Sequence, residues 1–365
     1  MKNKYINLII LLFVGFVVYA NSLRSPFMLD DYGFFNQFQG SSILSHFSPD
    51  PQRAYYRPLA HVVPHLNYLV FKMNPVCYHM VNVLLLSLAA WSVVLLLSMV
   101  MAGRLALAAG ILFLVHPINS IMVNYITASV FAVQIMCMCL ALYCMTLSFP
   151  RVLIGNLFFI LALLCHETSF MIPFYGVLLC LMREMNLKKA LNITKWLWLT
   201  LVLYMLFRAF NAPLSKSLFH SIAINGLSLG ESLASVLQLL SWYIQKLFYP
   251  VGIFLMWSKP FVHQASVYWL TIGLVCCVAL GVGLCYLWRV KQQAVLLFIL
   301  WFLIGLLPVF LGAFATPYMG ALLEPHWFIP ATVGLFAASV LLVSHLVQKF
   351  LWQHIIFAVV FGILV

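Results

Sequence analysis

Long runs of apolar residues, broken by short polar segments, dominate the chain from end to end. A helix needs about 20 apolar residues to cross the hydrocarbon layer of a membrane. About eleven runs come near this length, at residues 5–21, 77–101, 105–118, 128–149, 152–166, 169–183, 195–210, 266–288, 294–311, 328–347 and 350–365. The pattern predicts an all-α polytopic membrane protein with about eleven transmembrane helices.

Two long segments, 22–76 and 211–265, separate the runs unevenly and are expected on the exterior side. Within the second segment, apolar residues recur at helical spacing from Ser228 to Phe248, while Glu231 and Gln238 fall largely on another face. This pattern is typical of an amphipathic helix that lies in the interface or against the bundle. Residues 1–365 then form a single transmembrane domain, and no soluble domain or internal repeat is evident.

Orientation follows from lysine and arginine in short loops, which favour the cytoplasmic side. With the N-terminus in the cytoplasm, one side receives nearly all the loop cations: Arg104, Arg151, Arg183, Lys188, Lys189, Lys195, Arg289, Lys291 and Lys349. The first run could alternatively be a signal peptide with a weak cleavage site after Ala20. An uncleaved first span is favoured because further spans follow.

Composition agrees with a membrane location, since 65% of the residues are hydrophobic and only 7% are charged. The net charge of +12 comes from single basic residues between apolar runs, so it argues for sidedness and against nucleic-acid binding. The nine cysteines lie mostly inside apolar runs and show no zinc or redox spacing.

Carboxylates are scarce, and six of the seven fall on the predicted exterior side. Ionisable groups near membrane depth are costly and mark candidate functional sites. Asp30 and Asp31 stand together in the first exterior segment, where Arg57 could act as their counter-ion or as a phosphate ligand. A solvated turn is the alternative for this pair.

Other polar groups stand at exterior span ends: His116, His166, Glu167, Arg208, Glu324 and His326. Together they predict one shared polar cavity.

The ordered series of motifs resembles the GT-C superfamily of membrane glycosyltransferases, and especially the transmembrane O-mannosyltransferases that usually carry tetratricopeptide repeats. The matching motifs run in the same order over nearly the whole chain: Asn21-Ser22, Asp30-Asp31, Tyr56-Arg57-Pro58-Leu59, Tyr78-His79, Asn82, Leu114-Val115-His116-Pro117, His166-Glu167-Thr168, Phe207-Arg208, Leu247-Phe248-Tyr249-Pro250, Trp301 to Pro308, and Glu324 to Pro330. Two departures stand out. The repeats are absent, and His166 occupies a position where the family often has lysine.

This resemblance implies a GT-C-like fold, a polyprenyl-phosphate sugar as donor, and an acceptor outside the cytoplasm. It also implies that Asp30 is the catalytic base and that Asp31 supports it. We expect direct displacement with inversion at the anomeric carbon. Arg57, Arg208 and His116 are expected to bind the donor phosphate, and His166, Glu167, Glu324 and His326 to support the site or the acceptor.

No cofactor is expected, and no nucleotide-binding loop is present in the sequence. A divalent metal on Asp30, Asp31, Glu324 and His326 is possible but not favoured. The expected partners are the lipid-linked donor, a protein, glycan or lipid acceptor, and membrane lipids, at the periplasmic face of a bacterial inner membrane. A transporter or flippase would also line a cavity with ionisable groups, as would a glycan polymerase or ligase. The absence of a two-fold repeat argues against a transporter.

Overall fold

The computed structural model describes residues 2–28, 30–49, 55–146, 151–211, 228–252, 257–259, 267–313 and 321–349, and this part of the chain is almost entirely helical. Its α-helices are α1 (Lys2–Val18), α2 (Asp30–Phe38), α3 (Pro58–Phe71), α4 (Pro75–Leu97), α5 (Gly103–Val115), α6 (Ile121–Asn124), α7 (Ser129–Met145), α8 (Arg151–Cys165), α9 (Ile172–Met182), α10 (Leu187–Asn211), α12 (Leu229–Phe248), α13 (Val267–Arg289), α14 (Gln293–Ala313) and α15 (Ile329–Lys349). Its short 3-10 helices are η1 (Ala20–Arg24), η2 (Ile43–Phe47), η3 (Pro117–Asn119), η4 (Ile126–Ala128), η5 (Glu167–Met171) and η6 (Pro325–Phe328). Strands β1 (Trp257–Lys259) and β2 (Ala321–Leu323) form one short antiparallel ribbon.

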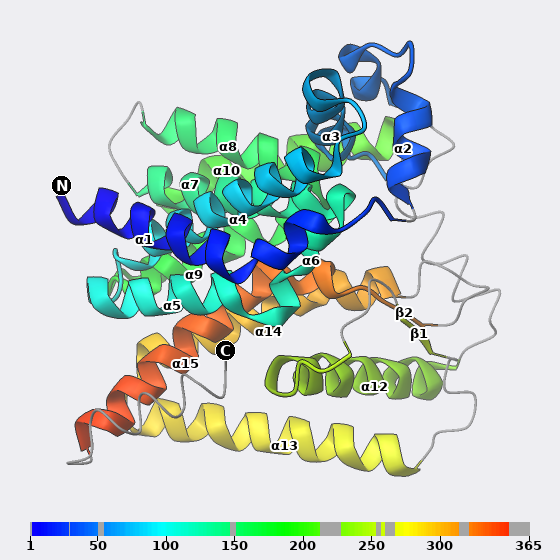
Figure 1. Ribbon diagram of the computed structural model, residues 1–365. Helices are drawn as coiled ribbons and strands as arrows, with labels where there is room; N and C mark the ends of the chain where they lie inside the picture. Colours follow the sequence, from blue (N-terminus) through cyan, green and yellow to red (C-terminus); the bar gives the residue numbers. More distant parts are fainter. Residues whose placement is uncertain are drawn as a thin grey trace.

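The long helices lie side by side along roughly one direction, so the molecule is a bundle (Figure 1). Helices α2 and α3 lie together at one end of the bundle, and the N-terminus, at the start of α1, lies at the opposite end. The predicted all-helical membrane architecture is therefore confirmed, apart from the short ribbon.

In the described part of the chain, six helical segments are long and apolar enough to cross a membrane. They are Pro75–Leu97, Ile126–Met145, Leu187–Asn211, Thr271–Arg289, Gln293–Phe310 and Pro325–Val347. A bent pair made of α5 and the turns to Asn124 would add a seventh, and three apolar helices are shorter. Each predicted run before residue 348 falls on a helix, and the run at 350–365 lies outside the described residues. The number eleven stays a prediction.

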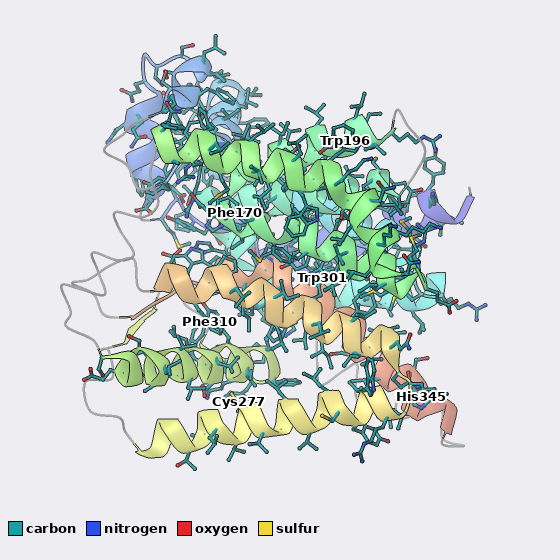
Figure 2. The ribbon with its side chains drawn as sticks, turned by 180° about the vertical axis from the view of Figure 1, so that it is seen from behind. Phe170, Trp196, Cys277, Trp301, Phe310 and His345 are labelled. Atoms are coloured by element: carbon teal, nitrogen blue, oxygen red, sulfur yellow. The ribbon has the colours of Figure 1, made fainter. Side chains whose placement is uncertain are left out.

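Close packing between side chains holds the bundle together. This is expected in a membrane, because moving an apolar side chain from lipid to a helix interface provides little hydrophobic driving force. The Trp301 ring of α14 stacks on Tyr175 of α9, with centroids 4.2 Å apart. At Gly334 of α15, a Cβ would lie 2.6 Å from the backbone oxygen of Phe298, so only glycine allows α14 and α15 to approach this closely. Figure 2 shows Trp301 between helices, while Cys277 lies on α13 at the edge of the bundle.

The amphipathic helix expected after Ser228 is present as α12. Its first turn is closed by a capping box, in which the Ser228 side chain accepts from the Glu231 backbone amide and the Glu231 carboxylate accepts from that of Ser228. The helix lies lengthwise along α13 (Figure 1), so its buried face packs against the bundle. Residues 212–227, 253–256 and 260–265 of the same predicted segment lie outside the described residues.

Several helices run from a basic start to a polar end. Helix α5 begins beside Arg104 and stops just before His116, and α8 begins at Arg151 and stops just before His166. Helix α10 begins next to Lys188 and carries Arg208 in its last turn. This common direction gathers the polar ends at one end of the bundle, on the side of α2 and α3.

Candidate functional site

The adjacent carboxylates Asp30 and Asp31 open helix α2 but face different surroundings. Asp30 is exposed, and its Oδ2 atom accepts a hydrogen bond of 2.8 Å from the Tyr125 hydroxyl. Asp31 is 1% exposed, and its Oδ2 atom accepts from the Met28 backbone amide at 2.9 Å. Burial raises the pKa of Asp31 to about 6, although backbone amides of Met28 and Thr127 counteract part of the rise. Only Asp30 is placed to meet a substrate.

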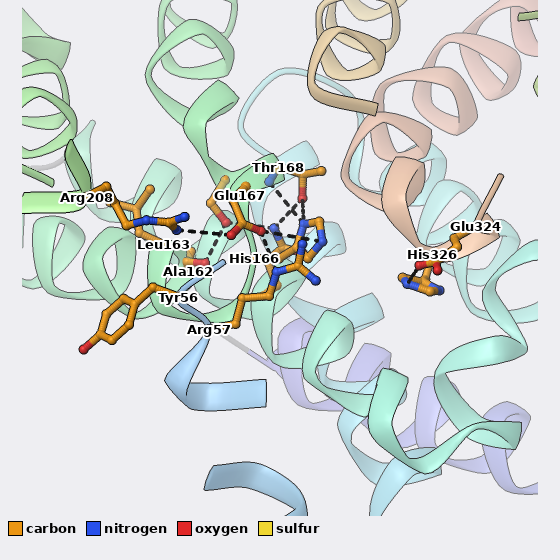
Figure 3. A network of polar contacts seen from close by, with 12 residues as sticks. Tyr56, Arg57, Ala162, Leu163, His166, Glu167, Thr168, Arg208, Glu324 and His326 are labelled. Atoms are coloured by element: carbon orange, nitrogen blue, oxygen red, sulfur yellow. Dashed lines mark hydrogen bonds and ion pairs between the residues drawn. The ribbon is translucent and has the colours of Figure 1, made fainter. Parts of the chain in front are cut away.

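A carboxylate held between two arginines forms the second part of the site (Figure 3). Arg57, which precedes α3, donates through Nε to Glu167 Oε2 at 2.5 Å, and Arg208 donates through Nη1 to Oε1 at 3.1 Å. The three groups carry a net charge of +1, because one carboxylate meets two guanidinium groups. Arg208 is almost fully buried, whereas the Arg57 side chain is 28% exposed. Arg57 is therefore the cation that an anionic ligand can reach.

Two histidines flank the ring of Phe131. The His166 ring lies 4.9 Å from it between centroids, and the His326 ring lies 4.5 Å from it on another element. His166 accepts from the Thr168 backbone amide through Nδ1, so this nitrogen carries no proton and the ring is neutral. His326 Nε2 lies 2.7 Å from Glu324 Oε2.

A cavity of about 760 Å³ unites these groups, and we refer to it as the central cavity. Its polar and aromatic lining includes Asp30, Gln37, Tyr55, Arg57, Tyr125, Phe131, His166, Glu324 and His326. The volume is in the range of ligand sites, about 300–1,000 Å³. A carboxylate and an accessible guanidinium thus face one space.

Two predicted phosphate ligands are placed differently from Arg57. His116 is buried, with Nε2 3.0 Å from the Leu247 backbone oxygen and Nδ1 accepting from the Ile118 backbone amide. His116 does not line the central cavity. Its ring instead links the end of α5 to the last turn of α12. Arg208 does not line the cavity; it pairs with Glu167, the same carboxylate that pairs with Arg57.

Sequence reasoning overlooked Tyr125 and Gln37, both of which line the central cavity. Tyr125 follows α6 in a turn between two spans, and only its position near the exterior end of the predicted fourth run could have marked it. Gln37 lies seven residues after Asp30, which places both on the same face of α2.

Among the residues that the structure describes, no group of three or more His, Cys, Asp or Glu side chains is arranged to hold a metal ion. Asp31 faces the protein interior, whereas Asp30, Glu324 and His326 line the central cavity. The expectation that no metal is required stays a prediction.

Fold and site together define a polytopic membrane protein whose polar cavity, with a carboxylate and a guanidinium in its wall, opens at one end of the bundle. The chain is 28% identical over 179 residues to protein O-mannosyl-transferase Tmtc1 of Drosophila melanogaster. The aligned region covers 43% of this chain and 20% of the relative. It is 30% identical over 172 residues to protein O-mannosyl-transferase tmtc2 of Xenopus laevis, covering 42% of this chain and 18% of the relative. No family model and no solved structure matches. The likeness to these partial, distant relatives supports a glycosyltransferase relationship.

Proposed function

We propose that this protein is a glycosyltransferase that moves a sugar from a polyprenyl-phosphate donor to an acceptor hydroxyl on the non-cytoplasmic face of the membrane. The observation that carries the proposal is that Asp30 and Arg57 line one cavity at the end of the bundle opposite the basic helix starts. The relatives named as O-mannosyl-transferases support the type of reaction.

In the proposed step, the acceptor hydroxyl attacks the anomeric carbon while Asp30 removes its proton. A bond forms between the acceptor oxygen and that carbon, and the bond from the carbon to the phosphate oxygen breaks. The lipid phosphate leaves with both electrons of that bond, and a single displacement inverts the anomeric configuration. General base catalysis typically contributes about 10²–10⁴-fold.

Arg57 is placed to bind the phosphate because it reaches the cavity and its counter-ion Glu167 is shared with Arg208. The surplus positive charge stabilises the charge that develops on the leaving phosphate. Tyr125 donates to Asp30 and holds that carboxylate in one orientation. Neutral His166 and the Glu324–His326 pair offer hydrogen bonds to sugar hydroxyls across the Phe131 ring.

The loop cations support a cytoplasmic location for the helix starts at Arg104 and Arg151, and so a non-cytoplasmic location for the cavity. We place the protein in a bacterial inner membrane, with the cavity on the periplasmic side. A lipid-linked donor on that side needs no nucleotide, because the lipid phosphate is itself the leaving group.

The decisive experiment is transfer from a labelled polyprenyl-phosphate sugar by the purified protein in lipid nanodiscs. We expect labelled product with the native chain, and a loss of at least about 100-fold with Asp30→Asn because the base is removed. Glu184→Gln is the matched control, since Glu184 is an exposed carboxylate in the turn after α9. If Asp30→Asn retains most turnover, the assignment fails. If the sugar crosses the membrane unchanged, the protein is a carrier.

A further inference from the structure

A second cavity adjoins the central one inside the first exterior segment. Its volume is about 560 Å³, and we call it the loop cavity. It is lined by residues of α2, η2 and the start of α3, among them Gln37, Ser41, Ser45, His46, Ser48 and Tyr55. Gln37, Tyr55, Arg57 and His61 line both cavities, so the two spaces meet along these side chains.

Helix α2 connects the catalytic group with this second space. Asp30 and Gln37 are seven residues apart on one helical face, which spans about 10 Å at 1.5 Å per residue. Gly33 and Phe34 lie between them on the same face and also line the central cavity. A molecule whose reacting hydroxyl lies beside Asp30 can therefore extend along α2 into the loop cavity.

The described lining of the loop cavity is polar and carries one permanent cation. That cation is Arg57, which also lines the central cavity and is assigned to the donor phosphate there; the described lining holds no lysine or carboxylate. With Arg57 engaged by the donor, the described walls offer no second lysine or arginine to a phosphate or an acidic peptide. An isoprenoid chain would cover the Gln37 amide without offering it a hydrogen bond, which is costly on burial.

The available groups fit an occupant rich in hydroxyls. Ser41 and Ser45 donate to the Phe38 and Ser42 backbone oxygens, and their oxygens keep lone pairs for an incoming donor. Gln37 is exposed, and its amide offers two donors and an acceptor. The Tyr55 ring is 46% exposed, with the Arg57 guanidinium 5.0 Å from its centroid, and supplies an apolar surface for the C–H groups of a sugar ring.

A peptide that binds by strand addition fits the described walls poorly. Extended peptides are commonly recognised by pairing with an exposed strand edge. The described residues around the loop cavity belong to helices and turns, and neither β1 nor β2 contributes to its lining.

We propose that the loop cavity is the acceptor subsite of this protein and binds a neutral saccharide of two to three sugar units, whose terminal hydroxyl reaches Asp30. The acceptor role of the saccharide rests on the proposed transfer reaction. Saccharide binding itself does not, because it can be measured without turnover. The relatives' names refer to protein acceptors, so the proposal separates this chain from them in substrate.

The test is saturation-transfer NMR of the intact protein in nanodiscs with mannotriose and maltotriose, and with a serine- and threonine-containing peptide as the competing probe. We expect at least one trisaccharide to bind the native chain, and its affinity to fall about tenfold or more in Gln37→Ala. Asn36→Ala is the matched control, because Asn36 is an exposed amide on the same helix that lines neither cavity. Ser48→Trp should abolish binding by filling the space.

The outcomes separate the two proposals. Binding of neither trisaccharide, equal binding by Gln37→Ala and Asn36→Ala, or peptide binding that depends on Gln37 would overturn the saccharide subsite. Binding that depends on Gln37 supports it even if no transfer is detected, in which case the transfer reaction fails alone.

Discussion

At the scale of single residues, the site depends on which atoms of each polar group already form hydrogen bonds within the protein. Asp30 and Asp31 are neighbours in the chain, yet one accepts from a cavity tyrosine and the other from backbone. Adjacent positions on a helix point about 100° apart, so two consecutive carboxylates cannot share one direction. Sequence reasoning found the pair, but its division of labour depends on what packs around α2.

Tyr125→Phe should reduce kcat for transfer by about tenfold and leave the KM of the donor unchanged. A hydrogen bond to a charged group contributes roughly 1.5–3 kcal/mol, and this one holds the base in position. Steady-state kinetics with the labelled donor provide the measurement. Tyr32→Phe is the control, since Tyr32 is exposed on α2 and lines neither cavity. An equal loss in both variants, or a change in donor KM alone, would contradict the positioning role.

Asp31 should make stability depend on pH in a definite direction. Its pKa is raised to about 6 in the folded protein, so the ionised form destabilises the fold above that pH and the cost disappears as pH falls towards 4. We expect Asp31→Asn to melt at a higher temperature than the native chain at pH 7.5, with the difference shrinking as pH falls and nearly gone at pH 4. Thermal unfolding in detergent at both pH values measures it; a difference independent of pH would exclude this cause.

At the scale of elements, the site is assembled by the ends of helices. Glu167 opens η5 between α8 and α9, Arg57 precedes α3, and Arg208 lies in the last turn of α10. The apolar runs predicted α8, α9 and α10, because burial in lipid requires continuous hydrophobic stretches with satisfied backbones. They did not predict α3, which lies in the exterior segment 22–76. They did not predict that one carboxylate would join two of the helix ends.

Glu167→Gln should destabilise the bundle by about 3 kcal/mol or more, because it leaves buried Arg208 without its carboxylate. The melting temperature of the purified protein measures the loss, with Glu184→Gln as the control at an exposed position. Adding the polyprenyl-phosphate donor should restore part of the melting temperature, since bound phosphate supplies the missing negative charge. An unchanged melting temperature would show that the arginines do not depend on Glu167.

At the scale of the whole molecule, the protein is a bundle with basic helix starts at one end and a polar cavity at the other. In the part of the chain that the structure describes, six helical segments meet the length of a span, and α12 packs lengthwise on α13. This polarity predicts sidedness: the cavity end faces away from the cytoplasm.

Alkaline phosphatase fused after Gly40 should be active, because that residue lies between α2 and η2 at the cavity end. A fusion after Asn186, in the turn between α9 and α10, should be inactive, because this enzyme requires an oxidising compartment to form its disulfides. Colony assays with each fusion, normalised for expression, give the answer. The reverse pattern would place the cavity in the cytoplasm and remove the basis for a lipid-linked donor on the other side.

The sequence by itself determined the membrane class, the positions of the long apolar helices and the short list of ionisable candidates. It could do so because lipid exposure demands long apolar runs and makes every charge within them conspicuous. Only the tertiary structure decided that Asp30 faces the cavity while Asp31 and His116 do not, and that Tyr125 and Gln37 belong to its wall. Those outcomes depend on contacts between residues up to about a hundred positions apart, such as Tyr125 with Asp30 and Arg57 with Glu167, and no local pattern encodes them.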